Sequence, residues 1–464
     1  MTRFSAALAT AVLAALAAGC SPAAREPAPA HQAATPATGK AAQPNVVLLL
    51  IDTLRADKMG CYGFGLDTTP ELDVFAKNGV RFRTVIAQSS WTRPSIASLL
   101  TSRYPRSVGI FEEQEGLLDG RFELLSETLQ GQGYTTIGAT ANPHLNRSFN
   151  FHQGFNHYLD TNVVYTFMKR PGDDRKLFKK SPLPSAQELF DQVFSLIAQG
   201  GGPPYYVQLC LMEVHEWYRG GKDLTRDAYR SLFPGDPNRK YLQPLRQISQ
   251  EIDTFVQKLL ALPGWSDTLF VIVSDHGEGL DDHPNVEKSR YHGRLLYESQ
   301  LRVPLILYRP GWTYAGRVIE RPVRLLDLMP TLLECAGAPV PAGLDGVSLM
   351  PLLQGGEVAL PPYFVAETEL REHDKAAVYG SDWKYIENYD QHVGLGPREL
   401  QAMGARENGV RTDRLAQHPD TAQAMAAYLE DWKKRYPKAT PVTRPDGLSP
   451  EETEQLKAIG YLGD

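Results

Sequence analysis

Cysteine is scarce in this sequence, with 4 residues in a chain of 464. Such a low content excludes a disulfide-rich scaffold, and the spacing of Cys61, Cys210 and Cys335 matches no zinc-binding template. These three cysteines allow at most one disulfide, and we interpret them as small buried apolar side chains. The remaining cysteine, Cys20, lies apart from them near the N-terminus.

An excess of positive charge is also missing. The formal net charge is −6, from 48 Lys and Arg against 54 Asp and Glu. A chain with this balance has no global attraction to nucleic acid or to anionic lipid, so we expect no nucleic-acid partner. Any anionic substrate must therefore be held by a local positive site, for which a bound metal ion is the simplest source.

The N-terminal apolar run, residues 6–18, is too short to span a membrane as a mature helix. Because this run ends in Ala17-Ala18 and is followed by Gly19-Cys20, we predict a bacterial lipoprotein signal over 1–19 and lipidation of Cys20, although an ordinary secretory signal gives a similar pattern. Residues 20–44 are rich in Ala and Pro and predict an extended tether. We expect a periplasmic or extracellular location on the bacterial cell envelope, with membrane contact through the lipidated N-terminus only.

Apolar strands alternate with amphipathic helices through the rest of the chain. The continuous apolar runs 45–51 and 268–274 predict strands that are buried on both faces. This alternation predicts an α/β fold with a large, mostly parallel, doubly wound sheet and helices on both faces over 45–360. From 361 to 464 the pattern changes to short strands and amphipathic helices, which predicts a smaller C-terminal α+β domain.

Polar side chains with metal-binding chemistry follow the two most apolar strands. Asp52 ends the first, and Asp275 and His276 end the second. Because sites in open α/β sheets lie at the carboxyl ends of the strands, folding could bring these three together. Each signal is weak alone, since an acid after a strand is often a helix cap and Asp-His-Gly is a common turn.

Thr92 is the hydroxyl group that such a site needs. It lies two residues before Pro94, which we expect to open an apolar helix. The free N–H groups at a helix N-terminus favour an alkoxide or a bound anion, and a nearby cation makes the hydroxyl proton easier to lose. Thr92 is therefore the expected nucleophile and a fourth metal ligand.

The order of these segments resembles that of sulfatase-like proteins in the alkaline phosphatase superfamily. The resemblance covers about residues 45–355 and implies that Asp52, Asp275 and His276 are metal ligands and that Thr92 occupies the nucleophile position. The segments that carry it are Asp52-Thr53-Leu54-Arg55-Ala56-Asp57, Cys61-Tyr62-Gly63, residues 90–105, Ser274-Asp275-His276-Gly277-Glu278 and Tyr297-Glu298-Ser299-Gln300-Leu301-Arg302-Val303-Pro304.

The resemblance also implies roles for two histidines. His215 lies in an element similar to the family's His-x-Pro-Tyr, with Trp217 replacing the proline, and His292 lies where the family places a residue that touches the anionic head of the substrate. Each could donate to a nonbridging oxygen or protonate the leaving group, with an ordinary core or surface histidine as the alternative. For His144 and His283 we expect the ordinary structural role.

Three departures from the sulfatase pattern fall next to the expected site. Thr92 cannot become the formylglycine that sulfatases make from cysteine or serine, Thr53 replaces an aspartate typical of calcium-binding members, and Ile96 replaces the arginine that supports formylglycine. These changes favour relatives with a threonine nucleophile. One divalent ion is expected, and calcium, manganese and zinc all remain open.

The prediction is a metal-dependent hydrolase of anionic esters, phosphate esters in first place, that acts through a covalent Thr92 intermediate. Three alternatives stay open: a sulfuric ester hydrolase of the arylsulfatase kind, a phosphoethanolamine or phosphoglycerol transferase acting on envelope lipid or glycan, and a non-catalytic lipoprotein that binds an envelope ligand. The sequence predicts neither the natural substrate nor the oligomeric state.

Overall fold

The computed structural model describes residues 43–111, 116–161, 183–219, 224–280, 282–286, 289–371, 373–390, 394–404, 413–443, 447–450, 452–453 and 457. The expected signal peptide, Cys20 and nearly all of the expected tether lie outside this set. Gln43–Asp464 forms one compact unit by its internal contacts. None of the helices in the described part combines the length and the apolar character that crossing a bilayer requires.

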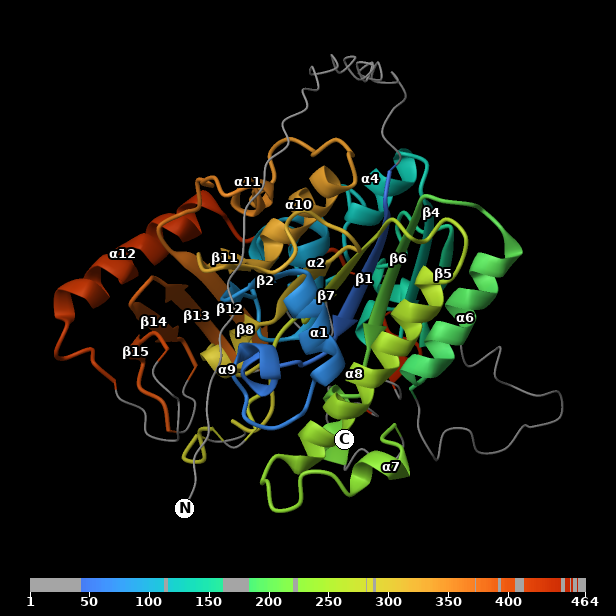
Figure 1. The fold of residues 1–464 in the computed structure, drawn as a ribbon. Helices are drawn as coiled ribbons and strands as arrows, with labels where there is room; N and C mark the ends of the chain where they lie inside the picture. The colour runs from blue at the N-terminus through green and yellow to red at the C-terminus, as the bar shows by residue number, and fades with distance from the viewer. Residues whose placement is uncertain are drawn as a thin grey trace, which may run out of the picture. The chain divides into compact units, whose positions relative to one another are not determined.

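An eight-stranded sheet lies at the centre of this unit (Figure 1). Its order is β10-β2-β9-β7-β1-β6-β4-β5, and β9 is the strand that runs antiparallel to both of its neighbours. The mostly parallel sheet predicted from the sequence is thus confirmed. The strands are β1 Asn45–Ile51, β2 Val80–Phe82, β4 Thr135–Thr140, β5 His157–Leu159, β6 Tyr205–Leu211, β7 Thr268–Val273, β9 Leu305–Tyr308 and β10 Arg317–Ile319.

Strand β1 explains why the run 45–51 is apolar throughout. It lies between β6 and β7, and Leu48 pairs in parallel register with Gln208 on one side and Val271 on the other. Every residue of β1 is buried. A central strand with covered faces needs apolar side chains in both directions, so the alternation typical of a half-exposed strand is absent.

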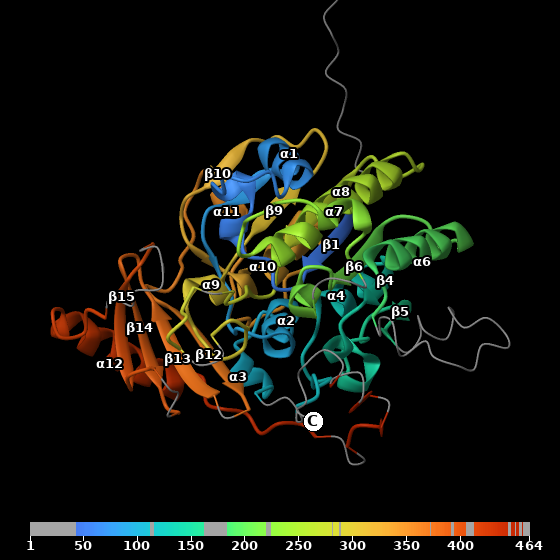
Figure 2. The same cartoon turned by 90° about the horizontal axis from the view of Figure 1, so that it is seen from below.

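Helices cover both faces of the sheet. Figure 2 shows α1, α6 and α8 on one face and α2 and α4 on the other. This arrangement confirms the doubly wound architecture. The helices are α1 Pro70–Asn78, α2 Thr92–Thr101, α3 Pro105–Val108, α4 Leu125–Gly131, α6 Ala186–Gln199, α7 Asp227–Arg230, α8 Arg239–Leu260, α9 Glu298–Leu301, α10 Leu328–Cys335 and α11 Met350–Leu353.

A second sheet of three very short strands lies beside the main one and was not predicted. Its order is β11-β3-β8. The strands are β3 Val85–Ile86, β8 Arg302–Val303 and β11 Val323–Arg324. Strands of two residues carry no readable period, so tertiary contacts alone define them.

The C-terminal region forms a four-stranded antiparallel sheet, β12 to β15, with α12 packed on it. Met425, Leu429 and Trp432 of α12 bury against the sheet together with Val378 and Tyr385. The predicted α+β character is thereby confirmed. The elements are β12 Phe364–Leu370, β13 His373–Tyr379, β14 Trp383–Asn388, β15 Arg398–Ala402 and α12 Pro419–Arg435.

Strand β12 also touches the loops of the larger part. The backbone N–H of Glu367 donates to the carbonyl of Gln88 at 3.0 Å, and Thr368 Oγ1 donates to the carbonyl of Gly293 at 2.7 Å. Gly293 directly follows His292, so the C-terminal sheet supports a loop that carries a predicted site residue.

Candidate active site

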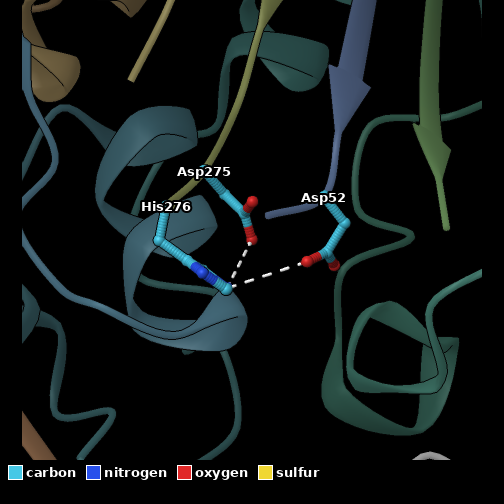
Figure 3. A group of neighbouring side chains, drawn as sticks. All are labelled: Asp52, Asp275 and His276. Carbon is cyan, nitrogen blue, oxygen red and sulfur yellow. Dashed lines mark ion pairs between the residues drawn. The ribbon is translucent and has the colours of Figure 1, made fainter. Parts of the chain in front are cut away.

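The ends of β1 and β7 bring Asp52, Asp275 and His276 together, as Figure 3 shows. His276 Nε2 lies 3.8 Å from Asp52 Oδ1 and 3.3 Å from Asp275 Oδ2. Each residue offers one ligand atom, and these atoms all lie within 4.8 Å of one another. We call these three residues the Asp-Asp-His cluster. The two strands are adjacent and parallel, so their carboxyl ends meet at one edge of the sheet.

The atoms of this cluster suit a divalent cation. Asp52 Oδ1 and Asp275 Oδ2 are buried and accept no hydrogen bond from the described residues. Burial, followed by the negative charge of Asp52, raises the pKa of Asp275 to about 6. Two buried carboxylate oxygens that accept no hydrogen bond are costly unless a positive charge neutralises them. The donor set of two carboxylates and an imidazole fits zinc or manganese and does not exclude calcium.

His276 has the tautomer that metal binding requires. Its Nδ1 lies 2.9 Å from the carbonyl oxygen of Gly277, which can only accept, so Nδ1 carries the hydrogen. Nε2 is then the nitrogen that faces the two carboxylates, where it would bind a cation through its lone pair. The backbone here is packed tightly, because a Cβ on Gly277 would lie 2.0 Å from the carbonyl oxygen of Ser299.

Thr92 lies against the Asp-Asp-His cluster. Helix α2 begins at Thr92 itself, two residues earlier than the sequence predicts, with Trp91 as its N-cap. Thr92 Oγ1 lies 3.3 Å from Asp52 Oδ2 and 3.2 Å from His276 Nε2. The structure thus brings together all four residues that were predicted as metal ligands.

The two predicted histidines extend this group. The ring of His292 lies 4.7 Å from the ring of His276 and 5.0 Å from that of His215. Their Nδ1 atoms contact carboxylates, His292 with Glu278 at 3.1 Å and His215 with Glu216 at 3.2 Å. The three imidazoles therefore form a continuous buried row beside Thr92.

Burial and charge act differently on the two histidines. For His292, burial outweighs the attraction of Glu278 and lowers its pKa to about 4. For His215, burial is opposed by the charges of Asp52 and Glu216, which together raise its pKa. The imidazole of His215 is thus the easier of the two to protonate near neutral pH.

Asn142 is a site residue that the sequence analysis missed. Its Nδ2 donates to Asp52 Oδ2 at 2.6 Å and lies 3.4 Å from Thr92 Oγ1, while its Oδ1 accepts the backbone N–H of His144 at 2.9 Å. Asn142 follows β4, which ends at the same edge of the sheet as β1. The rule that identified Asp52, a polar residue just after a buried strand, also applies to Asn142.

His144 and His283, the histidines expected to be structural, have different surroundings. His144 is fully buried, its ring lies 5.8 Å from Trp91, and burial followed by the charges of Arg93 and His215 lowers its pKa well below the usual value. His283 packs its ring 4.2 Å from that of Tyr297. His144 therefore lies in the same electrostatic environment as the imidazole row.

Thr53 and Ile96, the two departures from the sulfatase pattern near Thr92, have different environments in the structure. Thr53 has a positive φ of 59°, and its Oγ1 donates to the carbonyl of Asp52 at 2.7 Å. Ile96 is fully buried and belongs to the hydrophobic core. Arg93, next to Thr92, is also buried, with its guanidinium 4.2 Å from the centre of the Phe149 ring.

Comparison with known proteins gives the family. The Sulfatase family model matches residues 44–338, and a model for the C-terminal part of N-sulphoglucosamine sulphohydrolase matches residues 286–393. Human arylsulfatase A is 28% identical over 359 residues, which are 67% of this chain and 68% of the relative. The rat N-acetylgalactosamine-6-sulfatase is 28% identical over 435 residues, 83% of this chain and 79% of the relative.

Solved structures share the fold across sulfatases and phosphonate hydrolases. A phosphonate monoester hydrolase from Silicibacter pomeroyi has a TM-score of 0.66 at 18% identity and covers 86% of this chain and 96% of its own. A 2-O GAG sulfatase has a TM-score of 0.65 at 19% identity and covers 87% of this chain and 96% of its own. The chain belongs to the sulfatase family of the alkaline phosphatase superfamily and is an ester hydrolase.

Proposed function

We propose that the protein hydrolyses phosphoesters or phosphonate esters through a covalent intermediate on Thr92. The observation that carries this proposal is the position of Thr92 Oγ1, 3.3 Å from Asp52 Oδ2 and 3.2 Å from His276 Nε2 at the N-terminus of α2. A threonine with a purely structural role in a helix does not require a buried carboxylate and an imidazole beside its hydroxyl. Here both offer an acceptor to its hydroxyl proton.

The reaction runs in two displacements. Thr92 Oγ1 loses its proton and forms a bond to phosphorus while the bond from phosphorus to the leaving oxygen breaks, and the leaving oxygen takes up a proton. Water then loses a proton and forms a new bond to phosphorus, the bond to Thr92 breaks, and Thr92 Oγ1 takes up a proton. The oxygen electron pairs stay with the leaving atoms in both steps, so no oxidant or reductant is needed.

A divalent ion bound by Asp52, Thr92, Asp275 and His276 would supply positive charge that favours the Thr92 alkoxide and polarises the ester. The chain's own residues do the remaining work. Asn142 restrains Asp52 through its 2.6 Å hydrogen bond. His215 and His292 are the proposed donors to the nonbridging oxygens or to the leaving group.

Sulfate ester hydrolysis is the second candidate, because the relatives named arylsulfatase A and N-acetylgalactosamine-6-sulfatase share up to 28% identity with this chain. The phosphonate monoester hydrolases of the same fold favour the first candidate, together with the threonine at the nucleophile position. A threonine hydroxyl lacks the aldehyde hydrate on which the sulfatase mechanism of the family depends.

The test is a substrate and metal screen on the protein without residues 1–20. Aryl phosphate monoesters, aryl phosphate diesters, aryl phosphonates and aryl sulfates are each offered with calcium, manganese and zinc. Thr92→Ala should lose the activity, and Thr92→Ser should keep part of it. A phosphoryl adduct on Thr92, identified by mass spectrometry after rapid acid quenching, should accompany turnover in the wild-type protein.

Four other results of the screen would contradict the proposal or favour one of the alternatives. Activity retained by Thr92→Ala contradicts the covalent mechanism, and a clear preference for aryl sulfates contradicts the choice of substrate. Transfer to an added alcohol in place of water favours the transferase alternative. Absence of both turnover and bound metal favours a ligand-binding lipoprotein.

The cellular location is a separate proposal that rests on the sequence of residues 1–44. We propose a lipoprotein held on the bacterial cell envelope by lipid on Cys20, with the catalytic unit on the periplasmic or extracellular side. Metabolic labelling with an alkyne fatty acid should mark the wild-type protein and leave Cys20→Ser unmarked. Labelling of both proteins would contradict the lipid site.

A further inference from the structure

Trp217 stands where the sequence departs from the His-x-Pro-Tyr element, and the structure gives its indole a polar partner. The residue lies in the short 3-10 helix His215–Arg219 and is 3% exposed. Its Nε1–H donates to Glu278 Oε2 at 3.0 Å. Proline has no side-chain donor, so this hydrogen bond depends on the replacement.

Glu278 collects three donors while fully buried. Its Oε1 accepts the backbone N–H of Gly279 at 3.0 Å. Its Oε2 accepts the indole N–H of Trp217 and also lies 3.1 Å from His292 Nδ1. The indole N–H of Trp217 and the backbone N–H of Gly279 can only donate, so both oxygens of Glu278 act as acceptors here.

This carboxylate fixes the tautomer of His292. Because Glu278 Oε2 has no hydrogen to give, His292 Nδ1 must carry one, and Nε2 is left on the side of the ring turned away from Glu278. The ring of His276, whose Nε2 contacts Thr92, lies 4.7 Å from that of His292. The orientation of His292 within the imidazole row is thus set by Glu278 Oε2, which also accepts the N–H of Trp217.

We propose that Trp217 and Glu278 are positioning residues that act through His292, holding its ring angle and its Nδ1–H tautomer so that Nε2 serves the ester oxygens. The assignment rests on the role proposed above for His292. It gives a chemical reason for a tryptophan in place of proline, since proline has no side-chain donor with which to share Glu278 with the histidine. Trp217 itself does not touch the reacting atoms in this assignment.

The tautomer can be tested without any substrate. Nitrogen-15 NMR of protein labelled at its 11 histidines should show His292 protonated at Nδ1, with its signals assigned by their loss in His292→Gln. Glu278→Gln should shift His292 toward the Nε2–H form, because an amide cannot offer both oxygens of the carboxylate. Trp217→Phe should move the same signals by a smaller amount. Unchanged His292 signals in both variants would overturn the proposal.

Kinetics provide the second test, with the best aryl ester from the substrate screen. Trp217→Phe should lower kcat about tenfold and Glu278→Gln about a hundredfold, with KM within about twofold and the metal content unchanged. In a His292→Gln background both substitutions should have no further effect, because the residue they position is gone.

Trp265→Phe is the matched control. Trp265 is equally buried, stacks on Tyr205 with ring centres 5.0 Å apart, and precedes β7 at the end of the strand opposite the site. It should keep the wild-type kcat. Equal loss in Trp217→Phe and Trp265→Phe, or full additivity with His292→Gln, would show a merely structural tryptophan. If no ester is turned over, the proposed function fails while the NMR result still decides the positioning role.

Discussion

Asn142 Nδ2 donates to Asp52 Oδ2 at 2.6 Å, while the Asn142 Oδ1 accepts the backbone N–H of His144. The second contact fixes which end of the amide faces Asp52. Asp52 Oδ2 is thereby occupied, and Oδ1, which accepts no hydrogen bond from the described residues, is left for a cation. Asn142 thus determines which oxygen of the carboxylate would be available to a cation bound by the Asp-Asp-His cluster.

We expect Asn142→Ala to weaken metal binding and turnover about tenfold each, since Asp52 loses the donor that orients it. Metal affinity by isothermal titration calorimetry and kcat at saturating metal check the two effects separately. Asn146→Ala is the control, because Asn146 is equally buried in the same loop and bonds Thr161 at 2.8 Å. Equal metal affinity in wild type and Asn142→Ala would contradict this assignment.

A bound cation should also stabilise the folded chain, because it neutralises the buried carboxylates of Asp52 and Asp275. A metal at about a hundred times its Kd adds about 2.7 kcal/mol to the free energy of unfolding. Removing it with a chelator should lower the thermal midpoint of the wild-type protein. In Asp275→Asn the chelator should change the midpoint little. A drop of the same size in both proteins would place the stabilising ion elsewhere.

Glu213 should make stability depend on pH. Burial and the nearby charge of Glu251 raise the pKa of Glu213 to about 8, well above that of an unfolded chain. Its contribution to stability is therefore complete below about pH 4.5 and is lost as the pH rises toward 8, a change of the order of a few kcal/mol. Glu213→Gln, which has no proton to lose, should melt higher than wild type at pH 9 and similarly at pH 5.

Thermal midpoints of the two proteins between pH 5 and 9 check this expectation. Ser185→Ala is the control, because it removes the cap of α6, whose Ala186 N–H also donates to Glu213, without removing a titrating group. That variant should lower the midpoint by a similar amount at every pH. Parallel curves for wild type and Glu213→Gln would refute the raised pKa.

Gly277 should tolerate no side chain. A Cβ at this position would lie 2.0 Å from the carbonyl oxygen of Ser299, and the neighbouring backbone holds His276. Gly277→Ala should cost about 3 kcal/mol or more and should lower metal affinity, because relief of the clash moves the cluster. Gly65→Ala, where no heavy atom would lie within 4 Å of the new Cβ, should be nearly neutral. Chemical denaturation and metal titration compare the two variants.

The central strands and three of the site residues were predictable because their signals are local. The continuous apolar run of β1 requires burial between two other strands. An acid at the end of such a strand lies at the edge of the sheet where the parallel strands end. That logic correctly placed Asp52, Asp275 and His276 within one cluster. Asn142 was not predicted because its side chain is neither charged nor an imidazole, although its position after β4 follows the same rule.

Other features depend on contacts that no local pattern encodes. The two-residue strands β3, β8 and β11 exist because three distant segments pair with one another. The hydrogen bond from Trp217 to Glu278 joins positions 61 residues apart, so the sequence showed only that a proline was missing. The burial of His144 beside Trp91 likewise depends on how two loops meet.

The hydrogen bond from Thr368 to the carbonyl of Gly293 joins the C-terminal sheet to the loop that carries His292. Gly293 has a φ of +82°, and a Cβ there would lie 2.3 Å from Leu370 Cδ2, so β12 forms the wall behind the His292 loop. A fragment that stops before β12 would leave that loop without its outer support. The C-terminal sheet consequently supports the loop that carries His292, so we expect that the parts on either side of residue 360 cannot be exchanged independently.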